Sequence, residues 1–105
     1  MGGTMTAYAI GLYDVWDWSW HKEYRDPVTK LIEKHEGKYI ARSSICPWEM
    51  LEGEPPQDAS SFTLIEFPSM EHAKAWHRDL EYQPYIALRQ KGSNLKLILV
   101  EGCDG

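Results

Sequence analysis

The stretch FTLIEFPSMEHAKAWHRDLEYQPYIALRQKGSNLKLILVE, residues 62–101, decides the fold of this chain. Its first six residues, 62–67, are mostly apolar and rich in residues that favour strands. Pro68-Ser69 then has the composition of a helix start, so the pattern predicts a helix over 70–80. The apolar run over 95–101 predicts a closing strand, because it is too short and too dense in apolar residues for an exposed helix.

Between that helix and that strand, the sequence predicts a second, shorter helix. Pro84 suits the first turn of a helix, and Gly92 supplies its end. In the longer helix, the inner face is expected to carry Ala73, Trp76 and Leu80, which recur at helical spacing. The region therefore reads strand, helix, short helix, strand.

The N-terminal half predicts the same alternation of elements. Residues 6–15 alternate as a strand does, and a helix should follow the tryptophan-rich turn after them. Asp26-Pro27 interrupts this helical pattern, so we expect either two helical pieces that meet there or one kinked helix. Gly37 is placed to end the helix in a left-handed conformation. A second strand is then expected over 38–44, with 48–51 as a candidate continuation before the loop from Gly53 to Asp58.

The predicted order is β-α-β-β-α-β, which gives an α+β fold of the ferredoxin-like kind: a four-stranded antiparallel sheet with the helices on one face. If Leu64, Leu97 and Leu99 face the helices, the opposite face carries other apolar residues, namely Ile65, Phe67, Ile98 and Val100. A solvated sheet face normally alternates with polar residues. We therefore expect a homodimer in which the sheets of two copies pack together.

The composition limits which partners the chain can bind and in which compartment we expect it. It has 105 residues, a mass of 12.2 kDa and a formal charge of −5, and such an acidic surface argues against binding nucleic acid or an anionic membrane. We expect one domain over 6–102, between a disordered or extraneous segment at 1–5 and a tail at 103–105. With no signal-peptide pattern, Cys46 and Cys103 are expected to be reduced thiols of a cytoplasmic protein.

Several short segments together resemble the DUF1330 family, a domain of unknown function in the dimeric α/β-barrel superfamily. They are Leu51-Glu52-Gly53-Glu54, Ile65-Glu66-Phe67-Pro68-Ser69, Ala73-Lys74-Ala75-Trp76, Glu81-Tyr82-Gln83 with Arg89, and Val100-Glu101-Gly102. The resemblance implies a ferredoxin-like domain and pairing of two sheets into a barrel across a dimer, with no established activity. His77 stands where that family often has tyrosine, so a role for His77 is particular to this chain.

Two residues are candidates for acid–base chemistry. His77 follows Trp76 on the helix that packs against the sheet, and a histidine there can move protons near neutral pH. Glu66 shares a strand face with Phe62 and Leu64, where a carboxylate needs a cation or a raised pKa. The alternatives are a half-buried histidine bonded to the backbone and a structural ion pair between Glu66 and an arginine.

The remaining candidates would bind the substrate between the sheet and the helix that carries Trp76 and His77. They are Arg42, Trp76, Tyr82, Arg89, Tyr13 and Tyr24. An arginine can hold a carboxylate in bidentate fashion, and aromatic rings can line a cavity or simply fill the core. We expect Glu66 to reach Arg42 or Arg89.

We expect neither a metal ion nor a bound cofactor. The four histidines lack the spacing of a zinc site, and the chain has no glycine-rich phosphate loop.

Two hypotheses for the function remain. One is a small cofactor-independent enzyme acting on an aromatic or carboxylate-bearing molecule, as its superfamily relatives act as isomerases, cyclases and oxygenases. The other is a dimeric protein that binds a small ligand without catalysis.

Overall fold

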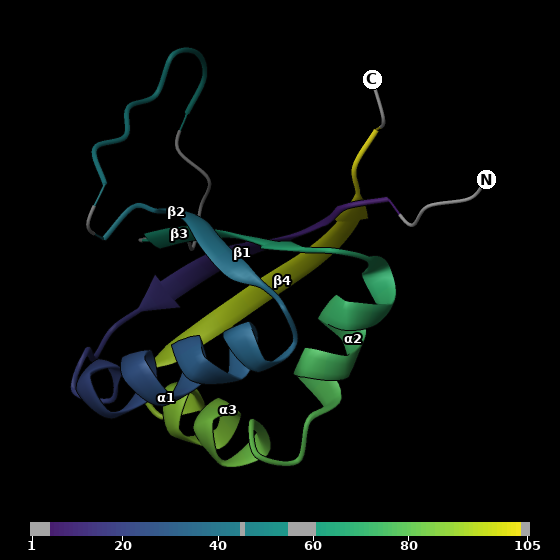
Figure 1. The fold of residues 1–105 in the computed structure, drawn as a ribbon. Coiled ribbons are helices and arrows are strands. Elements are labelled where there is room, and N and C mark those ends of the chain that lie inside the picture. Colours follow the sequence, from purple (N-terminus) through teal and green to yellow (C-terminus); the bar gives the residue numbers. More distant parts are fainter. Residues whose placement is uncertain (1–4, 45, 55–60, 104–105) are drawn as a thin grey trace.

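The computed structural model describes residues 5–44, 46–54 and 61–103 (Figure 1). Its elements in chain order are β1 (Ala7–Val15), α1 (His21–Lys34), β2 (Lys38–Arg42), β3 (Ser61–Phe67), α2 (Met70–Arg78), α3 (Gln83–Gln90) and β4 (Ser93–Glu101). The strands form one antiparallel sheet in the order β2-β3-β1-β4. All three helices cover one face of it (Figure 1). The predicted ferredoxin-like fold is confirmed.

The strand register determines which side chains share a face. Ala9 of β1 lies opposite both Ile65 of β3 and Leu99 of β4, so these three side chains point toward the helices. Ile10 lies opposite Leu64 and Ile98, which therefore point to the other face. The prediction that Leu97 and Leu99 face the helices is confirmed.

For β3, the predicted face was wrong. Ile65 and Phe67 are buried under the helices, whereas Leu64 lies on the uncovered face. The alternation within β3 correctly groups its residues into two sets. It does not say which set matches the helix-facing set of β4, because that depends on the pairing of both strands with β1.

Aromatic side chains dominate the core between the sheet and the helices. The largest buried members are Tyr13, Trp20, Tyr24, Phe67, Trp76 and Tyr82. They form a continuous series of ring contacts, in which Trp20 packs on Tyr24 and Trp76 stacks on Tyr82 at 4.8 Å between ring centroids. A small domain gains much of its burial from such large rings.

Helix α1 is one helix that contains Pro27, so of the two expected alternatives the structure has the single helix and not two pieces that meet at Asp26-Pro27. Pro27 cannot donate a hydrogen bond to the carbonyl four residues earlier. The helix nevertheless continues, because its buried stripe spans both sides of the proline: Tyr24, Val28, Leu31 and Ile32. Tertiary burial here outweighs the local preference.

Glu36, not Gly37, takes the left-handed conformation that ends α1, with φ of 64°. The backbone N–H of Gly37 donates to the carbonyl of Ile32 at 2.8 Å, as in a Schellman turn. Gly37 is required for another reason. A Cβ at this position would lie 2.5 Å from the ring of Phe67 and 2.9 Å from Ile32.

Two predicted element ends are also corrected. Strand β2 stops at Arg42, and 48–51 form no strand, although the Trp48 ring contacts Phe62. The loop expected over 53–58 lies partly outside the described residues. Helix α2 begins at the predicted Ser69 cap but ends at Arg78, which leaves Leu80 84% exposed.

In the described ranges, no helix is long and apolar enough to cross a membrane.

Candidate functional site

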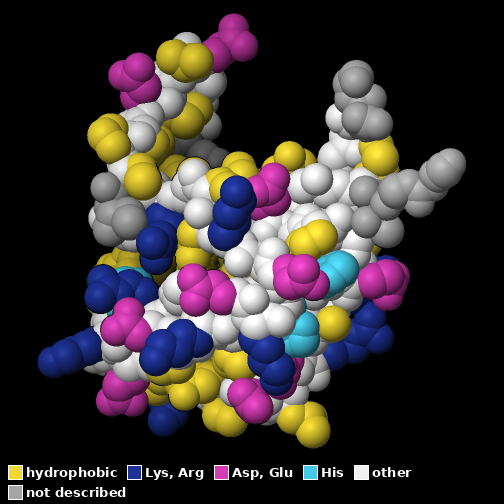
Figure 2. All heavy atoms as spheres, viewed as in Figure 1, with side chains coloured by type: hydrophobic (Ala, Val, Ile, Leu, Met, Phe, Trp, Pro, Cys, Tyr) yellow, Lys and Arg dark blue, Asp and Glu magenta, His cyan; other side chains and the backbone are white. Residues whose placement is uncertain are grey.

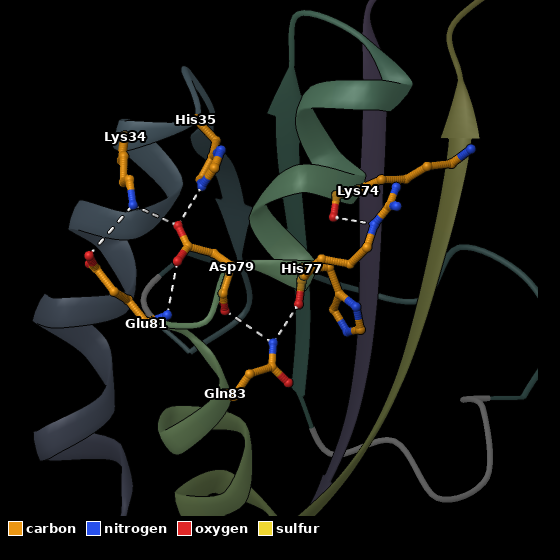
Figure 3. Close-up of polar contacts among 8 residues, drawn as sticks. Lys34, His35, Lys74, His77, Asp79, Glu81 and Gln83 are labelled. Carbon is orange, nitrogen blue, oxygen red and sulfur yellow. Dashed lines mark hydrogen bonds and ion pairs between the residues drawn. The ribbon is translucent and has the colours of Figure 1, made fainter.

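A pocket of about 210 Å³ lies where helix α2 crosses β1 and β4. Its apolar walls are Ala9, Ala73, Trp76, Leu97 and Leu99. Its polar lining comes from α2 alone: Lys74, His77 and Arg78. Figure 3 shows His77 and Lys74 extending from α2 toward these strands. The pocket therefore combines an apolar floor with a basic rim.

His77 occupies this rim as an exposed residue, next to the fully covered Trp76. Successive residues on a helix differ by about 100° in direction, so burial of one ring turns the next outward. The imidazole also makes an edge contact with Tyr82, at 6.2 Å between ring centroids. Partial burial of the ring, and then the positive charge of Arg89, lower the pKa of His77 below its usual value. The ring is therefore mostly neutral at pH 7 and able to accept a proton.

Behind the pocket, Arg89 is buried beside two tyrosines. Its side chain is 4% exposed, and its guanidinium lies 5.9 Å from the centre of the Tyr24 ring. The hydroxyls of Tyr24 and Tyr82 are hydrogen-bonded at 2.8 Å. Burial acts to lower the pKa of Arg89, but the neighbouring Tyr24 and Tyr82 raise it overall. In the described part of the chain, no carboxylate pairs with Arg89, and its Nε has no hydrogen-bond partner.

Glu66 is not part of this arrangement, contrary to the expectation that it reaches Arg42 or Arg89. It lies opposite Tyr8 and Lys38 in the register, on the sheet face away from the helices. Its carboxylate pairs with Lys38 Nζ at 3.3 Å and is half-buried. The alternation along β3 correctly places Glu66 with Phe62 and Leu64, but all three lie on the uncovered face. His77 and Glu66 therefore cannot act on one ligand within a single subunit.

Arg42 faces the helices but lies at the other end of the core. Its guanidinium covers the Tyr39 ring at 4.3 Å from the centroid. It lines a narrow crevice with Tyr13 and Tyr24 on the α1 side of the molecule. The structure thus divides the predicted set: Trp76 and His77 line the α2 pocket, Arg42, Tyr13 and Tyr24 line the α1 crevice, and Tyr82 and Arg89 are buried in the core.

One polar network that the sequence analysis missed fixes the end of α2 (Figure 3). Asp79 accepts hydrogen bonds from Lys34 Nζ at 2.9 Å and from the backbone N–H of Glu81 at 2.9 Å, and its Oδ2 lies 2.7 Å from His35 Nε2. The contacts with Lys34 and His35 hold the pKa of Asp79 well below its usual range. Gln83 Nε2 also donates to the backbone carbonyl of His77 at 3.0 Å. These bonds position the helix turn that carries His77.

Lys74 and Arg78 were also missed as rim residues. The sequence could have indicated Lys74, because it precedes His77 by three residues and so lies on the same face of the helix. Among the described residues, no cluster of three or more histidine, cysteine, aspartate or glutamate side chains could hold a metal ion. Cys46 and Cys103 are both free and exposed.

Comparison with known proteins identifies a matching family model and solved structures of similar fold. The sequence model of a domain of unknown function, DUF1330, matches residues 6–103. No curated protein matches the sequence. A solved structure of a protein of unknown function from Rhodopseudomonas palustris is similar, with a TM-score of 0.70, 17% identity, and coverage of 96% of this chain and 85% of that one.

Two further solved structures have the same fold. SnoaB, a cofactor-independent oxygenase from Streptomyces nogalater, has a TM-score of 0.66 and 9% identity, with 97% of each chain covered. A conserved protein of unknown function from Bacteroides thetaiotaomicron, described as a possible oxidoreductase, has a TM-score of 0.60 and 19% identity, covering 94% of this chain and 99% of that one. At such identities the similarity shows the fold alone.

Proposed function

This chain belongs to the DUF1330 family, and on that premise we propose that it binds a compact organic anion in the α2 pocket and transfers a proton to or from it. The ligand would be a small aromatic or carboxylate-bearing molecule, and His77 the proton acceptor or donor. No metal or tightly bound cofactor takes part in this proposal. The observation that carries it is the position of His77 on the basic rim of an apolar pocket.

The lining of the pocket supports an anionic, partly apolar ligand. Ala9, Leu97 and Leu99 offer contact for a flat apolar body, and Lys74 and Arg78 offer two cations at the mouth. Lys74 also lies 3.8 Å from the carboxylate of Glu71, but Glu71 is not part of the lining, so the lining itself is positively charged in a chain whose formal charge is −5. A volume of about 210 Å³ is below the range of roughly 300–1,000 Å³ typical of drug-sized ligands, which favours a small one.

The electrostatic surroundings of His77 support proton transfer. Partial burial, and then the charge of Arg89, lower the pKa of His77, so the neutral base is available at pH 7. The same positive charge would favour a negative charge that develops on a bound ligand after it loses a proton. The likeness to SnoaB, described as a cofactor-independent oxygenase, agrees with chemistry that needs only protein side chains.

A second candidate function is ligand binding without catalysis. Catalytic bases are usually oriented by a further polar group, and the predicted partner Glu66 lies on the opposite face of the sheet. In the described residues, no hydrogen bond holds the His77 ring. This observation favours a dimeric binding protein for the same class of ligand.

Deuterium exchange into phenylpyruvate separates the two functions. This probe has a ring, a carboxylate and an acidic C–H, and exchange in D₂O is followed by NMR. We expect the protein to accelerate exchange, and His77→Gln to slow it by about 10²–10⁴-fold with little change in binding. The acceleration should decline as the pH falls through the pKa of His77, which lies below its usual value.

His72→Gln is the matched control, because His72 lies on the same helix but not in the pocket. It should exchange as the unaltered protein does. Binding without accelerated exchange would favour the binding protein. Exchange that His77→Gln leaves unchanged would show that another group moves the proton, and phenylpyruvate that neither binds nor exchanges would contradict the proposal.

We further propose that two copies associate through the uncovered sheet face. This face carries apolar side chains from three strands: Tyr8, Ile10, Leu12, Phe62, Leu64, Ile98 and Val100. Ile98 and Val100 of β4 are 51% and 45% exposed, although both are large apolar residues paired with β1. Contact with a second, identical face would bury all of them.

A further inference from the structure

A second set of basic side chains lies at the opposite end of the helix layer, around the start of α1. A pocket of about 210 Å³ opens there, and we call it the vestibule; it is lined by His21, Arg25, Asp26, Thr29, Arg42 and Ser44. Figure 2 shows Lys and Arg side chains gathered on this side of the molecule, below the loop that follows β2. None of these residues lines the α2 pocket.

The positive charge of the vestibule is only partly balanced. Asp26 pairs with Arg25, between Oδ1 and Nε at 3.3 Å, and both side chains are mostly exposed. Among the described residues, Arg42 has no carboxylate partner, and its guanidinium lies over the Tyr39 ring, 4.3 Å from the centroid. Burial, followed by the charges of Arg25 and Arg42, lowers the pKa of His21. Two guanidinium groups and a mostly neutral imidazole therefore face a single opening with one carboxylate, which leaves the Arg42 charge unpaired within the described residues.

Aromatic rings adjoin the basic groups. The vestibule continues into a narrow crevice that shares His21, Arg25, Arg42 and Ser44 and is also lined by Trp18, Trp20, Tyr13, Tyr24 and Tyr39. Trp18 is 45% exposed and stacks on the buried Trp20 at 6.0 Å. The crevice holds only about 30 Å³, enough for a water-sized group, so the body of a ligand would stay in the vestibule.

We propose that the vestibule is a second ligand site, which binds a small aromatic carboxylate. The Arg42 guanidinium, which lies over the Tyr39 ring, would present its N–H groups to the carboxylate, and Arg25, whose Nε pairs with Asp26, would provide a second cation. A planar guanidinium matches a carboxylate better than it matches a neutral amide. Trp18, which is 45% exposed and lines the adjoining crevice, would contact the ring of the ligand where the vestibule meets the crevice. This site is separate from the α2 pocket, so neither proposal depends on the other.

Titration with benzoate, followed by ¹H–¹⁵N chemical shifts, tests this site. Benzoate should shift the resonances of Trp18, His21 and Arg42, whereas the neutral isostere benzamide and inorganic phosphate should bind at least about tenfold more weakly. Arg42→Met and Arg25→Met should each weaken benzoate binding by about tenfold or more. Lys22→Met is the matched control, because it removes one charge from an exposed residue of α1 outside the vestibule.

The outcomes differ in what they contradict. Shifts confined to Ala73 and His77 would place the carboxylate in the α2 pocket, which contradicts the vestibule site and leaves the proposed function intact. Phosphate binding as tight as benzoate binding would contradict the role of the aromatic rings. If Lys22→Met weakens benzoate binding as much as Arg42→Met does, the net charge of the protein explains the binding, and the proposed vestibule site is contradicted. If Arg42→Met fails to fold, Arg25→Met carries the same test.

Discussion

Asp79 connects the end of α1 to the turn that follows α2 through a single carboxylate. Lys34 and His35 come from the end of α1, and the backbone N–H of Glu81 comes from the turn between α2 and α3. The Asp79 side chain is 9% exposed, so its interactions are better shielded from water than those of an ordinary surface ion pair. At the scale of single residues, this carboxylate determines where α2 ends and how α1 is attached to it.

Replacement Asp79→Asn should therefore lower the melting temperature by several degrees at pH 7. Because the folded-state pKa of Asp79 is depressed, its contribution is present above its unfolded pKa of about 3.9 and is lost as the pH falls through the folded value. The difference between the two proteins should thus shrink below about pH 4. Thermal melts across this pH range measure it.

Glu81→Gln is the control for that comparison. Glu81 is 70% exposed and only 3.7 Å from Lys34, so its loss should change the melting temperature little. A difference between Asp79→Asn and the unaltered protein that stays constant down to pH 2 would mean that the carboxylate charge does not stabilise the fold.

Single residues also show how far the sequence determines the candidate site. Alternation correctly groups Glu66 with Leu64, and helical geometry correctly separates Trp76 from His77. Both rules act within one element. Whether Glu66 meets Arg42 depends on how β3 pairs with β1 and β2, and no pattern within β3 contains that information.

At the scale of elements, the turn between α3 and β4 holds the entry to α1. The backbone N–H groups of Trp16 and Asp17 both donate to the carbonyl of Gly92, at 3.0 and 3.1 Å. A Cβ at Gly92 would lie 2.2 Å from the carbonyl oxygen of Asp17 and 2.7 Å from the Trp20 ring. The sequence indicates Gly92 only as a helix end. Its close approach to another segment requires the tertiary structure.

Gly92→Ala should destabilise the protein by about 1–3 kcal/mol, because the added methyl group meets a backbone atom that cannot rotate away. Urea denaturation measures the free energy of unfolding. The neighbouring exposed change Lys91→Ala is the control and should stay within about 0.5 kcal/mol. A Gly92→Ala protein as stable as Lys91→Ala would show that the two segments are not in tight contact.

Helices and strands were predicted best where the local sequence pattern and the burial of side chains in the fold favour the same structure. The four strands, the Ser69 cap and the short helix that ends near Gly92 were all recognisable from spacing and turn residues. The errors occur where tertiary contacts override a local preference. Helix α2 stops before Leu80 because Asp79 turns the chain. At Pro27 the sequence allowed one helix or two, and the buried stripe that spans the proline makes it one.

At the scale of the whole molecule, the two faces of the sheet differ in what covers them. The helices bury one face, and the loop after β2 stands on the side away from the helices (Figure 1). Trp48 of that loop contacts Phe62, and Met50 and Leu51 are exposed beside it. Large exposed apolar surfaces on one side of a small domain are typical of an interface between protein chains.

The proposed dimer leads to the last prediction. Burying side chains such as Ile98 contributes about 1.5–3 kcal/mol each, and an obligate interface buries roughly 2,000 Å² or more. Ile98→Asp would place a charge in that interface, so it should give a monomer of reduced stability, as light scattering at micromolar concentration would show. Leu80→Asp, on an exposed residue at the helix side, should remain dimeric. An unaltered protein that is already monomeric at this concentration would contradict the sheet-to-sheet dimer.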